Sequence, residues 1–234
     1  AELLIDHAWG YEPCTIAQIR AYKPQSSSLG CGQVLHCPYT ADKARIVVQE
    51  MIDGISLELV EKRLVTDQLV LTVGYDIENL TRPEIRKVYK GPVTTDRYGR
   101  RVPKHAHGTW NLSRATSSSS ELLEAMAALY DKIVNPALLI RRMSLSACHV
   151  VNEKMAKERE QKETFEQLDL FTDYAKKEAK EKEEQKKRER ERRMQEALLT
   201  IKKKYGKNAV LRGMNFEEGA TAKERNGQIG GHQA

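Results

Sequence analysis

The chain has 234 residues, of which 40% are hydrophobic and 31% are charged, and its formal net charge is +6. At roughly 100–200 residues per domain, this length accommodates one domain, or one domain with an extension. No apolar run approaches the ~20 residues of a membrane-spanning helix, and no signal peptide is visible, so we expect a cytoplasmic protein without a membrane partner. The four cysteines have no C-x-x-C spacing, so neither a zinc site nor a disulfide framework is expected.

The charge is unevenly distributed. Residues 1–80 hold 6 Lys and Arg against 11 Asp and Glu, whereas residues 81–114 hold 9 against 2. A concentrated positive segment favours a polyanionic partner, of which nucleic acid is the simplest. A solvated basic loop without a partner would have the same composition, so charge alone leaves both interpretations open.

Residues 1–22 contain two short helical patterns separated by proline and are too short for a domain. Because the chain does not begin with Met, we interpret this stretch as the end of an upstream domain and a tether. A strand with a flexible Ser/Gly start is predicted over 25–37. Thr40 can then cap a helix that continues to about Arg63, with apolar residues recurring on one helical face.

Alternation of apolar and polar residues predicts a second strand over 68–75. The basic segment follows, and residues 96–100 are typical of a hairpin tip, with Gly99 supplying the unusual backbone angle. A third strand is predicted over 108–113. Ser118 and Glu121 form the pattern of a capping box, which begins a helix that ends before Pro136, and the last strand covers 138–151.

The element order is therefore β-α-β-β-α-β. This order predicts an α+β fold in which a four-stranded sheet carries two helices on one face. The other face is left open, with Ser, Thr, Arg and Lys available to line it.

The sequence from Asn152 onward has no pattern that could build a core. Residues 176–204 predict a long charged helix with Glu and Lys or Arg paired at i and i+4. Such a helix is either fully solvated or docks through its last turns, where Met194, Ala197, Leu198 and Ile201 form an apolar stripe. Residues 217–234 are polar and Gly-rich, which predicts disorder.

A short apolar stretch, Q-L-D-L-F, lies in the hydrophilic sequence before this helix. Large apolar side chains in such surroundings are typical of a linear peptide that docks in a partner's pocket, although five residues also form an apolar patch by chance. The stretch resembles the sliding-clamp-binding peptide of bacterial replication and repair proteins. All five positions match: Gln167, Leu168, Asp169, Leu170 and Phe171.

Further stretches resemble the Y-family DNA polymerases of the ImpB/MucB/SamB (UmuC-like) branch. They are Asp6-His7-Ala8-Trp9-Gly10, Tyr22-Lys23-Pro24, Gly32-Gln33-Val34-Leu35, Thr66-Asp67-Gln68, His107-Gly108-Thr109 and Lys204-Tyr205-Gly206-Lys207-Asn208. The resemblance covers nearly the whole chain. It implies four parts: the end of the thumb and its tether (1–22), a little-finger DNA-binding domain (23–151), the clamp-binding peptide with the charged helix (152–216), and the disordered tail (217–234).

The resemblance also implies that the parent protein is a translesion DNA polymerase of DNA repair and the SOS response. Its Mg-binding palm would lie upstream of Ala1, so we expect no catalytic residue, metal or cofactor in this chain, and no DNA synthesis by it alone. Asp76 and Glu78 form a D-x-E pattern reminiscent of a two-metal site, but we interpret them as loop salt-bridge partners. His105 and His107 have no third metal ligand at a suitable spacing.

The implied partners are DNA template-primer, the bacterial sliding clamp and the upstream catalytic core of the same polypeptide. In the family, the open sheet lies along the major groove and a Thr/Arg/Ser-rich strand end contacts the backbone. Here that strand end corresponds to Thr109, Ser113, Arg114 and Thr116. The other DNA-binding candidates lie on the first and last strands, on the basic strand or in the basic insertion 77–105: Ser26, Ser27, Ser28, Arg141, Arg142, His107, Arg97, Arg100, Arg101 and Lys104.

Two other classes of function stay open. An RNA-binding sheet of similar topology would carry surface aromatics on its central strands for base stacking, and Trp110 is the strong candidate. A scaffold built on the charged helix would bind no DNA once that helix is removed.

Overall fold

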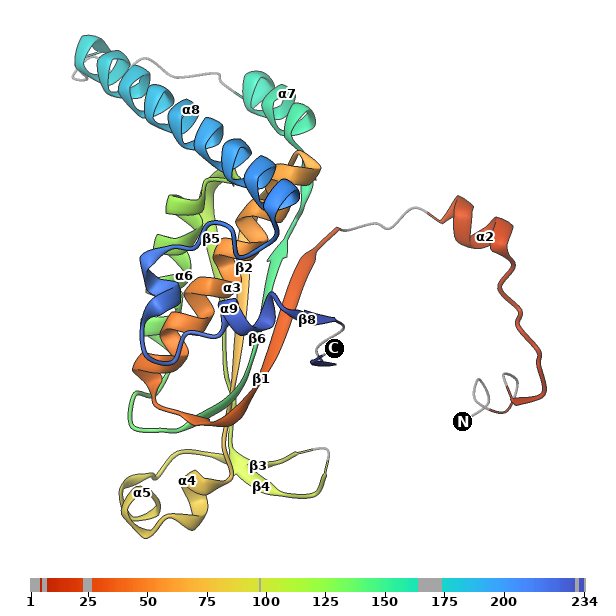
Figure 1. Ribbon diagram of the computed structural model, residues 1–234, viewed down its shortest axis with the longest axis vertical. Helices are drawn as coiled ribbons and strands as arrows, with labels where there is room; N and C mark the ends of the chain where they lie inside the picture. The colour runs from red at the N-terminus through yellow and green to blue at the C-terminus, as the bar shows by residue number, and fades with distance from the viewer. Residues whose placement is uncertain are drawn as a thin grey trace.

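The structure is a computed structural model that describes residues 5, 8–22, 27–96, 98–163, 174–229 and 232–233. The predicted clamp-binding peptide Gln167–Phe171 lies outside the described residues, as do Ser26 and Arg97. The fold is α+β, with a mostly antiparallel sheet, several helices and a long C-terminal helix, as the sequence predicts (Figure 1).

Four long strands form the sheet, in the order β1-β6-β2-β5, and all neighbours are antiparallel. Their bounds are Leu29–Tyr39 (β1), Leu64–Tyr75 (β2), Ala106–Thr116 (β5) and Ile140–Cys148 (β6). The short β7 (Val151–Asn152) also pairs with β2. Because β6 lies between β1 and β2, and β2 lies between β5 and β6, the chain forms the predicted split βαβ arrangement.

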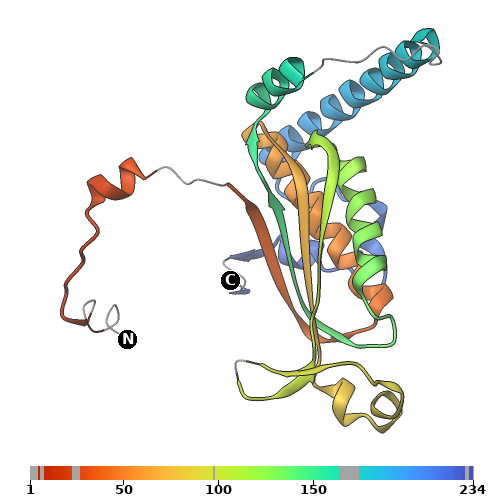
Figure 2. The ribbon, with the colours of Figure 1, turned by 180° about the vertical axis from the view of Figure 1, so that it is seen from behind.

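Two helices, α3 (Ala41–Lys62) and α6 (Ser119–Ile133), cover one face of this sheet (Figure 2). Alternate residues of the two central strands point into the core, where Leu69, Leu71, Val73, Met143 and Leu145 are buried. On β5, Gly108 allows α6 to approach closely, because a Cβ atom there would lie 2.8 Å from Cγ2 of Ile133.

Both predicted helix starts are correct to within a residue. The helix α3 follows Thr40, although the Thr40 hydroxyl makes no capping hydrogen bond. Ser118 caps α6 by accepting a hydrogen bond from the backbone N–H of Glu121. The Glu121 side chain does not complete the capping box and instead pairs with Arg114.

The basic insertion between β2 and β5 contains two short helices and a hairpin. These are α4 (Glu78–Thr81), α5 (Pro83–Val88), β3 (Val93–Thr95) and β4 (Arg101–Pro103), and Gly99 at the tip has the predicted positive φ of 76°. Buried Asn79 fixes the base of the insertion. Its Nδ2 donates to the carbonyls of Asp76 and Leu139, both at 2.8 Å, and its Oδ1 accepts from the Leu139 N–H at 2.7 Å.

The carboxylates of the D-x-E pattern, Asp76 and Glu78, make local contacts. The Asp76 carboxylate accepts from the Glu78 N–H at 2.9 Å, and Glu78 forms an ion pair with Arg82 at 2.5 Å. Within the described residues, no group of three or more His, Cys, Asp or Glu side chains is arranged to hold a metal ion.

Towards the C-terminus, α7 (Glu153–Glu163) leaves the sheet and α8 (Tyr174–Tyr205) returns to the helical side (Figure 1). The last turns of α8 dock, but not through the predicted apolar stripe, since Met194 stays 53% exposed whereas Gln195 is 1% exposed. The Gln195 amide donates to the Ser119 hydroxyl at 2.8 Å, and that hydroxyl lies 2.7 Å from the Ser56 hydroxyl of α3. In the described part of the chain, no helix combines the length and apolar composition needed to cross a bilayer.

After Gly206, the chain crosses α3. It forms η1 (Gly213–Phe216), α9 (Ala222–Arg225) and two short strands, β8 (Gln228–Ile229) and β9 (His232–Gln233). The sequence predicts disorder over 217–234, but residues 217–229 have a defined conformation, in which Thr221 is buried.

The buried carboxylate of Glu50 explains this difference. It accepts hydrogen bonds from the N–H groups of Thr221 (2.8 Å) and Ala222 (3.0 Å) and from the Asn215 amide (2.7 Å). A charged group out of water needs such partners. The composition of the tail does not reveal them, because their acceptor lies on a distant helix.

Replacing Glu50 with Ala should release the tail. The variant removes the acceptor of at least three hydrogen bonds, and charge-assisted bonds of this kind contribute about 1.5–3 kcal/mol each. We expect fast amide hydrogen exchange across 213–225, with little change in the sheet. Glu58→Ala, which removes a half-exposed carboxylate from the same helix, should leave exchange in 213–225 slow. Equal exchange in both variants would contradict the role given to Glu50.

Candidate nucleic-acid interface

The sheet face opposite α3 and α6 is lined by small and polar side chains. The strand register places them in rows that cross the sheet. One row contains Gly32, Ser144, Thr72 and His107; the next contains Gly30, Ser146, Val70 and Thr109; a third contains Cys148, Gln68 and Asn111.

These rows are close-packed and hydrogen-bonded. Thr72 Oγ1 lies 2.9 Å from Nδ1 of His107, and Nε2 of Gln68 donates to Oδ1 of Asn111 at 2.9 Å. A Cβ atom on Gly30 would lie 2.9 Å from the Ser146 hydroxyl. Most of the described side chains on this face are short, and they present hydroxyl and amide groups, which are the kind of group that contacts nucleic-acid phosphates and sugars.

Arg142 places a positive charge on this surface. It lies on β6, next to Val34 of β1 and Gly74 of β2 in register, and is exposed. A Cβ atom on Gly74 would lie 2.6 Å from Cγ of Arg142, so the arginine stem occupies the space that a side chain would take. Among the described residues, the guanidinium of Arg142 has no hydrogen-bond or ion-pair partner.

Four residues predicted to contact DNA therefore share the open face: His107, Thr109 and Ser113 of β5 with Arg142 of β6. Ser27 and Ser28 are exposed just before β1 begins, and the Ser27 carbonyl accepts from the N–H of Val150. The open face also contains polar residues that the sequence reasoning missed, namely Gln68, Thr72, Asn111, Ser144 and Ser146. Their alternation with core residues was the signal that could have identified them.

Three other predicted residues are held in internal contacts. Arg114 alternates onto the helical side and pairs with Glu121. Thr116 is buried, and its hydroxyl accepts from the Ser118 N–H at 3.1 Å. Arg141 donates to the His36 carbonyl at 3.0 Å and lies 3.7 Å from the Asp76 carboxylate.

In the insertion, Arg101 and Lys104 are exposed, whereas Arg100 stabilises the hairpin tip. Its guanidinium lies 2.7 Å from the Asp96 carboxylate and 5.0 Å from the centre of the Tyr98 ring. Hydrogen bonding from the Arg100 side chain holds the pKa of Asp96 below its usual value. The insertion thus offers Arg101 and Lys104 for an external anion.

Trp110, the candidate for base stacking, lies on the helical side and packs against the core. Over the described strands β1, β2, β5 and β6, the open face has no Phe, Tyr or Trp. The arrangement therefore does not favour the RNA-binding alternative, which depends on surface aromatics.

Comparison with known proteins adds little to this description. No protein-family model and no curated protein matches the sequence. Among solved structures, one match is the complex of the beta-clamp processivity factor and the little finger domain of PolIV. The TM-score is 0.32 and the identity 8%, over 62% of this chain and 100% of that chain. A TM-score of that size establishes neither a shared fold nor a shared function.

Arg114, on the helical side, and Arg142, on the open face, should respond differently to substitution. Arg114→Ala removes a partly exposed ion pair and should lower the free energy of unfolding by about 0.5–1 kcal/mol, with little effect on DNA affinity. Arg142→Ala should leave stability unchanged and weaken duplex binding, reducing the slope of log K against log salt by about 0.9. Denaturant titration and fluorescence anisotropy measure the two effects, and the opposite pattern would place the interface on the helical side.

Proposed function

We propose that this chain is the DNA-binding little-finger region of a translesion DNA polymerase, and that it holds template-primer through the phosphate backbone. The observation that carries the proposal is the open sheet face, which presents hydroxyl and amide groups together with Arg142, a cation that has no partner within the described part of the chain. The resemblance of several stretches to Y-family polymerases supports the same function. Thr109 and Ser113, for which that resemblance implies contact with DNA, lie on this face.

Phosphate contacts suit that role because they position a protein on DNA without reading the sequence. A bypass polymerase must accept any template, including a damaged one. The short side chains in the rows do not extend into a groove as a recognition helix would. Specific base contacts need groups that reach the base edges, so we infer a surface that follows the backbone.

We further propose that the chemistry takes place in an upstream part of the same polypeptide. In this proposal, the present chain supplies DNA affinity, and the palm of the parent polymerase supplies the catalytic carboxylates and Mg. The second proposed partner is the bacterial sliding clamp, bound through Gln167–Phe171. Clamp binding would raise the concentration of the polymerase near a stalled primer end without new DNA contacts.

The first test is the salt dependence of duplex binding. If Arg101, Lys104 and Arg142 each neutralise one phosphate, the logarithm of the binding constant should fall as the logarithm of the salt concentration rises. The slope should be about −2.7 or steeper. A fourfold rise in salt would then weaken binding by at least about 40-fold. Fluorescence anisotropy with two duplexes of unrelated sequence should give equal affinities.

The matched variant is Arg101→Ala/Lys104→Ala/Arg142→Ala. It should reduce the magnitude of the slope of log K against log salt by about 2.7. Binding that ignores salt, or that prefers one duplex sequence strongly, would reject the proposed mode of binding.

The second test is calorimetric titration of the chain with purified bacterial sliding clamp. We expect a micromolar dissociation constant for the wild-type chain. Leu170→Ala/Phe171→Ala should weaken binding by a factor of 30 or more, because each anchor contributes about 1–2 kcal/mol. The control Met194→Ala/Ile201→Ala removes exposed apolar side chains from α8 and should bind like the wild type; equal binding by the Leu170/Phe171 variant would remove this stretch from the proposal.

A further inference from the structure

The helix α8 is strongly basic. Between Tyr174 and Tyr205 it has 13 Lys and Arg against 7 Glu, a net charge of +6, which equals the formal net charge of the whole chain. A free helix would present this charge in every direction. Since α8 is docked, the structure determines which cations face the protein and which face solvent.

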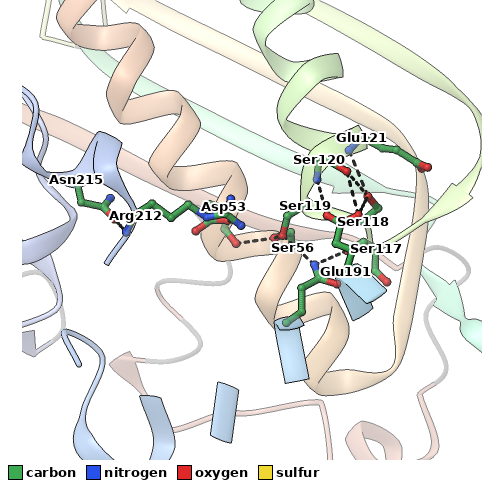
Figure 3. Close-up of polar contacts among 11 residues, drawn as sticks. Asp53, Ser56, Ser117, Ser118, Ser119, Ser120, Glu121, Glu191, Arg212 and Asn215 are labelled. Atoms are coloured by element: carbon green, nitrogen blue, oxygen red, sulfur yellow. Dashed lines mark hydrogen bonds and ion pairs between the residues drawn. The ribbon is translucent and has the colours of Figure 1, made fainter. Parts of the chain in front are cut away.

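The docked side of α8 makes specific polar contacts with the start of α6 (Figure 3). The Glu191 carboxylate accepts from the Ser118 hydroxyl at 2.7 Å and from the Ser120 N–H at 2.8 Å. A carboxylate at this position is favoured by the unsatisfied N–H groups and the dipole of a helix N-terminus. Buried Gln195, one turn later, donates to Ser119. These contacts fix the rotation of α8 about its own axis.

Two basic residues on the docked side have acidic or hydroxyl partners. Arg192 lies 3.3 Å from the Glu153 carboxylate, and its guanidinium also donates to the Ser117 hydroxyl at 3.1 Å. Lys203 forms an ion pair with Glu61 at 2.7 Å. The positive charges of Arg192 and Lys203 are therefore balanced within the molecule.

The outward side lacks this balance. Lys186, Arg190 and Arg193 recur at i, i+4 and i+7, so they share one face of the helix, and all three are exposed. Among the described residues, the side chains of Lys186 and Arg190 have no ion-pair or hydrogen-bond partner. Arg193 is 79% exposed and lies 4.0 Å from Glu189. Like charges at i and i+4 repel one another, and a bound polyanion would relieve that repulsion.

We propose that this outward face of α8 is a second contact for the nucleic-acid backbone. The inference rests on the proposed function, because DNA is the polyanion which that function brings to the module. At 1.5 Å per residue the three cations span about 10 Å, over which one strand of a duplex rises past about three phosphates. The helix packs on α3 and α6, so this contact lies away from the open sheet face and enlarges the footprint.

The test uses the full chain with Lys186→Ala/Arg190→Ala/Arg193→Ala. Loss of three phosphate contacts should reduce the salt slope of duplex binding by about 2.7. Ala favours helix at exposed positions, so helix content by circular dichroism should not fall. The control Lys62→Ala/Lys132→Ala/Lys223→Ala removes the same charge from exposed positions elsewhere and should change the slope by less than about 1.

Comparing the α8 variant with the Arg101/Lys104/Arg142 variant, and with the variant that combines all six substitutions, separates this inference from the proposed function. If the Arg101/Lys104/Arg142 variant loses slope but the α8 variant behaves like its control, the sheet face binds DNA and the inference is wrong. If each triple variant loses slope and the losses add, as expected for distant sites, both surfaces contact DNA. If the wild-type chain does not bind duplex, both ideas fail together.

An acidic protein is the other ligand that such a face could take, and poly-glutamate of similar charge serves as its probe. We expect poly-glutamate to bind much more weakly than duplex. Poly-glutamate binding as tight as duplex binding, lost in the α8 variant, would assign the face to a protein partner and overturn the nucleic-acid proposal.

Discussion

Burial of one face of the sheet is the constraint on which the rest of this structure depends. Side chains alternate across a strand, so covering one face with α3 and α6 divides every strand into core positions and surface positions. Leu69, Leu71 and Val73 are buried by that division, while Thr72 is turned to the open side. The proposed DNA surface is therefore the other half of the pattern that builds the core.

The sequence predicted those parts of the fold that depend on local patterns. Alternation identified β2, helical spacing identified α3, and Gly99 identified the hairpin tip. The site was less predictable, because a resemblance indicates which strand end contacts DNA but not which side chains are already paired. Arg114 is a cation on the strand expected to contact DNA, yet it already forms an ion pair with Glu121. Arg142 depends on the neighbouring Gly74, which only the strand register brings beside it.

The C-terminal third illustrates a second limit of sequence patterns. Composition predicts a disordered tail and leaves α8 either solvated or docked through its last turns, because neither segment has a wide apolar face. Both are nonetheless fixed by polar groups whose partners are far away in the chain. Glu191 accepts a hydrogen bond from the Ser120 N–H, Arg212 forms an ion pair with Asp53 at 2.7 Å, and Glu50 accepts from the Thr221 N–H. Burial raises the pKa of Asp53, and the nearby Arg212 guanidinium opposes that rise. Docking of this kind requires the folded module as its template.

The contacts of Glu50 also bear on the order in which the molecule folds. They join residues separated by 165 to 172 positions, so the connecting chain must lose the entropy of a long loop before they form. The acceptor is in place only once α3 has packed on the sheet, which makes attachment of the tail a late step. Interactions formed after the folding transition state slow unfolding rather than accelerate folding. We therefore expect the attached tail to slow unfolding of the module without accelerating its folding.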